Sequence, residues 1–319
     1  MNKEESEVKV ISIKFPIKEK PIKENMVVAL GFFDGLHFGH QALIKHAKEI
    51  ATKKGLPLGV MTFNRHPKEI YQNDKTFVYL NTLKEKEAKL AKLNVDYMLV
   101  VDFDENFSKL EPQEFIDQVL LKLNIDTAVV GFDYTYGPKD VANIENLPKF
   151  VKGRFDIVVE PKHMEAGQKV GSTNIRHAIE TGKIELADKL LGAPYTTSGI
   201  IVKGYRRGHT IGFPTANLEI EGDKVIPAEG VYATRTLIDG KWYDSMTSVG
   251  YNDTFENKEL TIESHLFGFD KEAYGKAMTI AWYKYMRGNE KFAGIPELSA
   301  QLKKDQENIQ NYFNQLDKK

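Results

Sequence analysis

The chain has 319 residues, of which 41% are hydrophobic and 28% charged, and it contains no cysteine. Its 44 Lys and Arg residues nearly balance its 45 Asp and Glu residues, which argues against a protein built to bind nucleic acid or a membrane surface. The lack of cysteine excludes disulfides, thiolate metal ligands and cysteine nucleophiles. Because the length exceeds that of one ordinary core, we expect two domains.

The N-terminal segment MNKEESEVKV is charged and has none of the apolar character of a secretory signal. No stretch of the chain approaches the roughly 18 apolar residues of a membrane helix. We therefore expect a cytoplasmic protein without a membrane segment, whose partners are small molecules and not nucleic acid. The sequence predicts no oligomeric state.

Apolar strand patterns alternate with amphipathic helix patterns from residue 26 to about 160. The predicted strands are MVVAL (26–30), LPLGVMTF (56–63), DYMLVVDF (96–103), TAVVGF (127–132) and FDIVVEP (155–161). Continuous apolar strands in alternation with helices are typical of a parallel sheet covered on both faces. We therefore expect residues 1–185 to form a doubly wound α/β domain.

Three amphipathic helices are predicted between these strands, at residues 40–55, 82–94 and 111–124. The middle helix is rich in charge, and we expect its lysines to form a solvated face. These lysines are Lys84, Lys86, Lys89 and Lys92.

The pattern changes after two short helical segments, 173–182 and 183–192, each of which ends in glycine. Between residues 196 and 286 the segments alternate with a period of two and are separated by Gly, Pro, Asn or Asp. Short strands at this spacing indicate a small antiparallel β-barrel. A closing helix is predicted from residue 295, so we expect residues 186–319 to form the second domain.

The stretch GFFDGLHFGH (31–40) leaves the first of these predicted strands through three glycines and carries two histidines. Ligands of doubly wound sheets bind beyond the carboxyl ends of the strands. Glycines let the backbone approach a ligand, and a helix N-terminus offers unpaired N–H groups to an anion. We therefore predict a phosphate site, with His37 and His40 as additional donors. A metal pair and an ordinary turn remain as alternatives, although a metal needs further ligands.

A second stretch, GSTNIRHAI (171–179), has Ser172 and Thr173 at a predicted helix start and Arg176 one turn further on. The hydroxyls are also explained as simple helix caps. An arginine beside a helix N-terminus is nevertheless well suited to clamp a polyphosphate. Two such loops in one α/β domain indicate a nucleoside triphosphate, although neither a Walker P-loop nor a G-x-G-x-x-G fingerprint occurs in the first of them.

Together these two stretches resemble the H-x-G-H nucleotidyltransferases, which have a Rossmann-like fold. Three further motifs, TFNRHP (62–67), GFDYTYG (131–137) and GHTIGFPTANL (208–218), are similar to those of the prokaryotic bifunctional riboflavin kinase/FAD synthetase family. The resemblance continues in order along nearly the whole chain, through PAEGVYA, ESHLFGFD, YGK and RGNEKF.

For the N-terminal domain the resemblance implies transfer of AMP from ATP to FMN, with Mg²⁺ bridging the phosphates and with FAD and pyrophosphate as products. The catalytic residues that it implies are His37, His40 and Arg176. The ATP-binding residues that it implies are Gly31, Phe33, Asp34, Gly35, Gly39, Ser172 and Thr173. The flavin-binding residues that it implies are Asn64, His66, Lys68, Asp133, Tyr134 and Tyr136.

For the second domain the resemblance implies phosphorylation of riboflavin to FMN. Thr215 and Asn217 would bind Mg²⁺, and Glu263 would take the proton from the riboflavin 5′-hydroxyl. Arg287 would border the riboflavin pocket. The backbone would fold around the ATP phosphates at three glycines, Gly204, Gly208 and Gly212.

The sequence departs from the family pattern at several positions. Arg65, Lys68 and Gly171 stand where the family usually has Pro, Arg and Ser, and these changes bear on flavin affinity more than on ATP binding. In the second domain Asp253 replaces a proline and His209 replaces an arginine. An acidic residue near a triphosphate is unfavourable unless a cation offsets it, so both changes bear on the kinase.

Three alternatives to a bifunctional enzyme follow. The first is a monofunctional FMN adenylyltransferase with a weak or silent kinase-like domain. The second is a non-catalytic flavin or nucleotide sensor, which the intact histidine pair disfavours. The third is a nucleotidyltransferase with another acceptor, against which the GFPTAN motif and the barrel argue.

Overall fold

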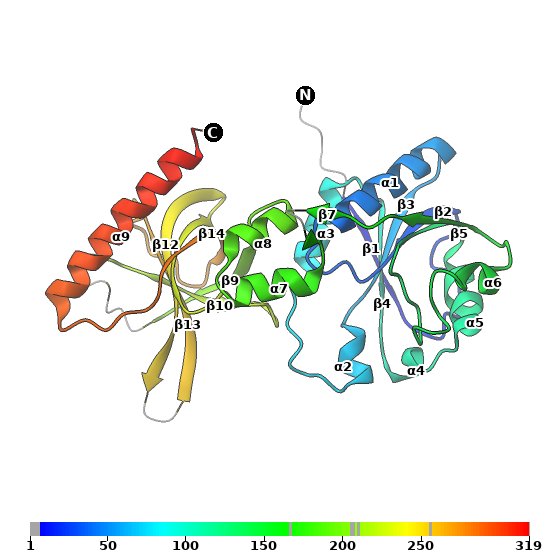
Figure 1. Ribbon diagram of the computed structural model, residues 1–319, viewed down its shortest axis with the longest axis horizontal. Coiled ribbons are helices and arrows are strands. Elements are labelled where there is room, and N and C mark those ends of the chain that lie inside the picture. The colour runs from blue at the N-terminus through cyan, green and yellow to red at the C-terminus, as the bar shows by residue number, and fades with distance from the viewer. Residues whose placement is uncertain (1–6, 166–167, 205–207, 209–210, 255–256, 319) are drawn as a thin grey trace. The chain divides into compact units, whose positions relative to one another are not determined.

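The computed structural model describes residues 7–165, 168–204, 208, 211–254 and 257–318 (Figure 1). The contacts within the chain divide it into two compact units, Met1–Gly171 and Ser172–Lys319. The first contains a six-stranded sheet and the second a closed barrel, so the predicted α/β fold followed by an antiparallel barrel is confirmed. The domain boundary near residue 185 stays a prediction, since the contacts group residues 172–185 with the barrel.

The sheet of the first unit is parallel throughout, with the strand order β1-β4-β3-β2-β5-β6. Its strands are β1 (Lys9–Ile13), β2 (Met26–Leu30), β3 (Leu58–Phe63), β4 (Tyr97–Val101), β5 (Ile125–Gly131) and β6 (Asp156–Glu160). The sequence predicted all of these except β1. That strand lies at an edge of the sheet and buries only Ile13 fully, so it lacks the continuous apolar run of a central strand.

Successive residues of β2 point to opposite faces of the sheet and enter two separate cores. Val27 and Ala29 pack with α1 (Phe38–Lys54) and α3 (Leu83–Lys92). Met26, Val28 and Leu30 pack against the opposite layer of helices. That layer comprises α4 (Glu105–Ser108), α5 (Pro112–Glu114), η1 (Phe115–Val119), η2 (Leu120–Leu123) and α6 (Leu147–Val151). The sheet is therefore doubly wound, as predicted.

Three small elements complete this unit. They are α2 (Pro67–Tyr71), which follows β3, and the two-stranded pair β7 (Met164–Glu165) and β8 (Gln168–Lys169). The predicted helix at 111–124 is present as α5, η1 and η2, with a wide π-type turn over η1 and a tight 3₁₀ turn over η2.

The second unit begins with α7 (Ser172–Glu180) and α8 (Ile184–Leu191) and continues into a closed antiparallel barrel. The barrel strands are β9 (Thr196–Val202), β10 (Ala216–Ile220), β11 (Gly230–Ile238), β12 (Lys241–Thr254), β13 (Asn257–Leu266) and β14 (Ala277–Arg287). The closing helix α9 (Ile295–Leu316) packs Ile309 and Phe313 against the outside of the barrel. The sequence missed only β10, because GFPTAN indicates a turn.

The barrel interior contains a cluster of hydroxyl groups from three strands. Thr234 and Thr236 of β11, Ser245 and Thr247 of β12, and Ser264 of β13 are each fully buried. Their side-chain oxygens lie 2.7–3.0 Å apart in a connected set of hydrogen bonds. Every one of these buried hydroxyls has a partner, as burial requires.

Candidate active sites

The loop after β2 has an unusual backbone that brings its residues back over the strand end. Phe33 and Leu36 have φ values of 55° and 48°, and Gly35 has a φ of 82°. Left-handed conformations are rare for side chains as large as Phe and Leu, so the surrounding structure must hold this loop.

His37 ends the loop and caps α1. Its Nδ1 atom accepts a hydrogen bond from the backbone N–H of His40 at 3.3 Å. In a neutral His37 the ring proton is consequently on Nε2, which leaves that atom as a donor. The first turn of α1 has no acidic side chain, so its N-terminal N–H groups and the helix dipole favour an anion.

The two histidine rings stack on each other, with centroids 3.6 Å apart and planes 17° apart. Burial, the neighbouring His37 and the charge of Lys86 hold the pKa of His40 well below its usual value. His40 is therefore a neutral imidazole near pH 7. The described residues contain no group of three or more His, Cys, Asp or Glu side chains that could hold a metal ion, so a metal at this pair finds no further such ligand there.

One glycine of the motif makes room for a ring. A Cβ atom on Gly31 would lie 3.0 Å from Cζ of Phe33, so glycine allows this ring to fold back onto the backbone. A Cβ atom on Gly39 would lie 3.4 Å from Cε1 of His37, which is an ordinary van der Waals contact.

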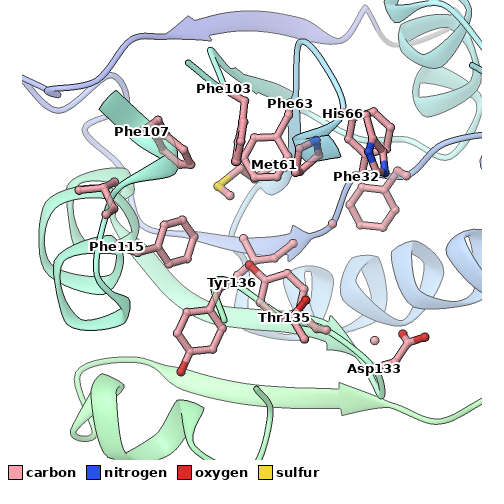
Figure 2. A pocket seen from close by; sticks show the side chains of 18 of the residues that line it. Phe32, Met61, Phe63, His66, Phe103, Phe107, Phe115, Asp133, Thr135 and Tyr136 are labelled. Carbon is pink, nitrogen blue, oxygen red and sulfur yellow. The ribbon is translucent and has the colours of Figure 1, made fainter. Parts of the chain in front are cut away.

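A cavity of about 430 Å³ opens beside this loop, within the first unit. Seven of the predicted site residues line it: Gly31, Phe33, His40, His66, Asp133, Tyr134 and Tyr136. In Figure 2 the rings of Phe103, Phe107 and Phe115 gather toward one end of the cavity, and Asp133 lies toward the other. A single pocket thus combines two histidines, a carboxylate and a wall of aromatic rings.

Most of the aromatic wall was not predicted from the sequence. Phe63, Phe103, Phe107 and Phe115 pack ring against ring, with centroid distances of 5.0–6.1 Å. The sequence does contain one signal for this wall, because Phe103 and Phe107 follow β4 at a spacing of four residues. Such a spacing is equally typical of core residues, so it does not by itself indicate a site.

Tyr136 brings a hydroxyl group to this wall. Its ring stacks on Phe115 with centroids 5.9 Å apart, and its buried hydroxyl has no hydrogen-bond partner among the described residues. Burial raises the pKa of Tyr136 to about 12, so the hydroxyl keeps its proton and can donate.

Other predicted residues of the first unit lie away from the cavity lining. The Asn64 amide bridges two strand ends, since Nδ2 donates to Asp102 and Oδ1 accepts from the N–H of Phe103. Lys68 is exposed on α2. Asp34 is buried and accepts a hydrogen bond from the N–H of Leu80 at 3.0 Å.

Ser172, Thr173 and Arg176 are on α7, which the contacts group with the second unit. Ile175, Ala178 and Ile179 form the buried side of this helix. The assignment of the three polar residues to the ATP phosphates therefore stays a prediction.

The sequence interpretation of α3 was wrong at one position. Lys86 was expected on a solvated face with Lys84, Lys89 and Lys92, but it is only 2% exposed. The i, i+4 spacing of Lys86 and Leu90 places both on the buried side of the helix, and that periodicity was the available signal.

In the second unit three predicted kinase residues come together on adjacent strands. Asn217 of β10 pairs directly with Glu263 of β13, and Thr215 just before β10 donates from Oγ1 to Oε2 of Glu263 at 3.0 Å. A Cβ atom on Gly204 would overlap the Asn217 amide, so only glycine allows this approach.

Two other predicted glycines, Gly208 and Gly212, lie in the segment that leads into β10. The N–H of Phe213 donates to the carbonyl of Gly208, and a Cβ on Gly208 would overlap the Phe213 carbonyl oxygen. Gly212 has a φ of 83°. His209 lies outside the described residues, as does the side chain of Asp253.

A second cavity, of about 360 Å³, adjoins Thr215. Its lining includes Pro214, Thr215 and Ala216 at the start of β10 and a loop from Phe269 to Tyr274. No residue of that loop was among the site residues predicted from the sequence.

Arg287, predicted beside the flavin, is bound to a carboxylate of α9. Its Nη2 and Nε donate to Oδ2 of Asp305 at 2.7 and 3.0 Å. The Arg287 and Asp305 side chains are 15% and 4% exposed, so this is a largely buried ion pair.

The fold and these two sites define a nucleotidyltransferase domain followed by a kinase-type barrel domain, and comparisons with known proteins agree. A family model described as FAD synthetase matches residues 19–174, and one described as riboflavin kinase matches residues 191–313. The chain belongs to the bifunctional riboflavin kinase/FMN adenylyltransferase family.

Two members of this family and one crystal structure are similar to the chain over most of its length. The chain is 46% identical over 295 residues to the enzyme of that name from Listeria monocytogenes, covering 92% of this chain and 94% of the other. It is 42% identical over 318 residues to the Bacillus subtilis enzyme, covering 98% and 100%. A crystal structure described as a macrolide-efflux protein from Streptococcus pneumoniae is 36% identical, with a TM-score of 0.88, and covers 95% of this chain and 99% of the other. Across the described part of this chain, no helix has both the length and the apolar character needed to cross a membrane.

Proposed function

We propose that this chain phosphorylates riboflavin to FMN in its barrel unit and adenylylates FMN to FAD in its α/β unit. The observation that carries the second activity is the single cavity lined by His40, Asp133 and the two tyrosines Tyr134 and Tyr136. A flavin needs an aromatic, mostly apolar pocket with a few polar groups, and this cavity supplies both.

In the adenylyl transfer an oxygen of the FMN phosphate attacks the α-phosphorus of ATP, and the bond from that phosphorus to the β-phosphate bridging oxygen breaks. The reaction needs no covalent protein nucleophile, so the protein contributes position and charge stabilisation. We assign the triphosphate to the N-terminus of α1, where Nε2 of His37 is a donor. His40 is proposed to stabilise the pentavalent phosphorus. Ser172, Thr173 and Arg176 keep the role predicted from the sequence, which is to hold the departing pyrophosphate.

In the kinase reaction the riboflavin 5′-hydroxyl attacks the γ-phosphorus of ATP, and ADP leaves. Glu263 is the proposed base, and the hydrogen bond from Thr215 fixes the orientation of its carboxylate. Arg287 is proposed to border the riboflavin pocket, in an orientation that Asp305 maintains.

The residues around Glu263 are chemically suited to Mg²⁺. The hydroxyl of Thr215 and the amide oxygen of Asn217 are oxygen ligands two residues apart, beside the Glu263 carboxylate, and Mg²⁺ prefers oxygen ligands together with substrate phosphates. Mg²⁺ would neutralise charge on the transferring phosphates. We propose Mg²⁺ for both reactions, and removal with EDTA should abolish both activities, with recovery on addition of excess MgCl₂.

The test is a time course with purified protein, riboflavin and Mg-ATP, with flavins separated by chromatography. FMN should appear first and FAD later. Glu263→Gln should lower FMN formation about a hundredfold or more but leave the conversion of supplied FMN to FAD unchanged. His40→Asn should do the reverse, which makes each variant the folding control of the other.

The result also decides among the remaining alternatives. FAD formation from FMN without any FMN formation from riboflavin would show a monofunctional adenylyltransferase. Binding of FMN and ATP without release of pyrophosphate would show a sensor. We further propose that the protein acts in the cytoplasm, where ATP and flavins are present.

A further inference from the structure

The most unusual charged group outside the proposed substrate contacts is Lys86 of α3. It is 2% exposed, and a lysine is rarely buried to this extent without a defined partner. The Lys86 Nζ atom lies directly beneath the loop that carries the histidine motif.

Three contacts hold this ammonium. Nζ donates to the carbonyl oxygen of Phe32 at 2.7 Å and to Oγ1 of Thr62 at 2.9 Å. The same Thr62 hydroxyl donates to the Phe32 carbonyl at 2.7 Å. Nζ also lies 4.6 Å from the centroid of the Phe32 ring, in a cation–π contact. Lys86 therefore fixes both the backbone and the ring of the residue that precedes the left-handed Phe33.

The rest of the loop is bound by the same segment of chain. The N–H of Gly35 donates to Oδ1 of Asn81, and the N–H of Leu80 donates to the Asp34 carboxylate. Left-handed conformations such as those of Phe33 and Leu36 are strained, and they persist only when neighbouring groups hold them. Residues 80–86 supply those groups.

We propose that Lys86 is a positioning residue for FMN adenylylation: its buried ammonium clamps the Phe32 carbonyl and thereby sets the loop that presents His37 and His40 to the nucleotide. The inference rests on the proposed adenylyl transfer in the first unit. Lys86 lines no part of the cavity, so it acts through the loop and not by contact with substrate.

The charge of Lys86 has a second effect at the same place. Burial lowers the pKa of Lys86 to about 8, with the nearby Asp34 opposing the change, so the ammonium remains mostly protonated at pH 7. This positive charge is one of the causes that keep His40 neutral. Its field also favours an arriving triphosphate.

The test uses Lys86→Met in the full chain, because Met has a similar length and removes both the donor and the charge. Met has a similar volume, and the Thr62 hydroxyl still donates to the Phe32 carbonyl, so we expect the variant to fold, and its thermal stability is measured beside its activity. We expect kcat/KM for FMN adenylylation to fall about tenfold to a hundredfold, since a small displacement of a catalytic loop has effects of that size. The riboflavin kinase activity of the same preparation should not change.

A histidine titration by NMR distinguishes positioning from simple structural support. Without the Lys86 charge, the pKa of His40 should move up toward its usual value. The matched control is Lys84→Met, which is exposed on the same helix and should leave both the activity and the titration unchanged.

Three outcomes would overturn the inference. The first is a kcat/KM for FMN adenylylation by Lys86→Met that lies within twofold of that of the parent chain. The second is a loss of activity in which the thermal stability also falls and the pKa of His40 does not change. If Lys86→Met does not fold, Thr62→Val removes the shared hydroxyl while keeping the shape of the side chain, and unchanged adenylylation by that variant is the third. If the parent chain itself forms no FAD from FMN, it is the proposed function that fails.

Discussion

The Arg287–Asp305 ion pair links the last barrel strand to α9, and Asp305→Asn is the sharpest test of what that link contributes. Both Arg287 donors reach Oδ2 of Asp305, while Gln301 donates to Oδ1 at 2.8 Å. Asn has the same shape as Asp but no charge, so the change leaves a largely buried guanidinium without its counter-charge.

The magnitude follows from the burial of the pair. Removal of one partner from a buried ion pair costs about 3–5 kcal/mol. Asn still offers one acceptor and Arg287 is 15% exposed, so we expect the lower end, about 3 kcal/mol. For a unit of this size each kcal/mol lowers Tm by about 3 °C, which gives a fall of about 10 °C.

The assay is thermal inactivation of riboflavin kinase, with FMN adenylylation followed in the same samples. The kinase should lose activity at a lower temperature than in the parent chain, and adenylylation should be affected only through α7, which belongs to the same unit. The matched control is Asp239→Asn, which removes an exposed pair with Lys276 and should lower Tm by less than about 2 °C. A fall below 3 °C for Asp305→Asn, or one equal to that of the control, would refute the reasoning.

Two further predictions concern single polar groups. Burial raises the pKa of the Asp188 carboxyl to about 8, although the hydrogen bond from the N–H of Tyr195 to Oδ1 acts to lower it. The carboxyl therefore stabilises the folded unit fully below about pH 4, and this stability is lost as the pH rises to about 8. Asp188→Asn should therefore raise the free energy of unfolding of the second unit at pH 8 by up to about 5 kcal/mol, since each pH unit between about 4 and 8 corresponds to about 1.4 kcal/mol, with no difference near pH 4 in calorimetry. Tyr136→Phe removes a hydroxyl that has no partner in the described residues, so stability should stay the same or rise by up to about 1 kcal/mol. The KM for FMN should rise about fivefold if this hydroxyl binds the flavin, and an unchanged KM would remove it from the flavin site.

Local patterns were sufficient for most of the fold. The apolar runs of β2 to β5 are uninterrupted because both faces of the sheet are covered there, and such runs can be read directly. β1 at the sheet edge and β10 after GFPTAN could not be recognised, because neither has the apolar pattern of a buried strand.

The barrel interior shows the same limit in another form. Thr234 and Ser264 are fully buried, yet as isolated residues they indicate a solvated strand face. Only closure of the barrel brings their hydroxyls within hydrogen-bond distance of those on neighbouring strands, and this pairing is what makes their burial possible.

The candidate sites divide in a similar way. The sequence alone determined the motifs that carry the chemistry, because glycine, histidine and carboxylate spacings are local and few backbones accommodate them. It could not determine that the rings of Phe103 and Phe115 form one cavity wall with Tyr136, or that the inward side of α3 places Lys86 against the carbonyl of Phe32. Those facts depend on which strand ends and helix faces meet in three dimensions, and contacts between residues far apart in the chain leave no periodic trace in the sequence.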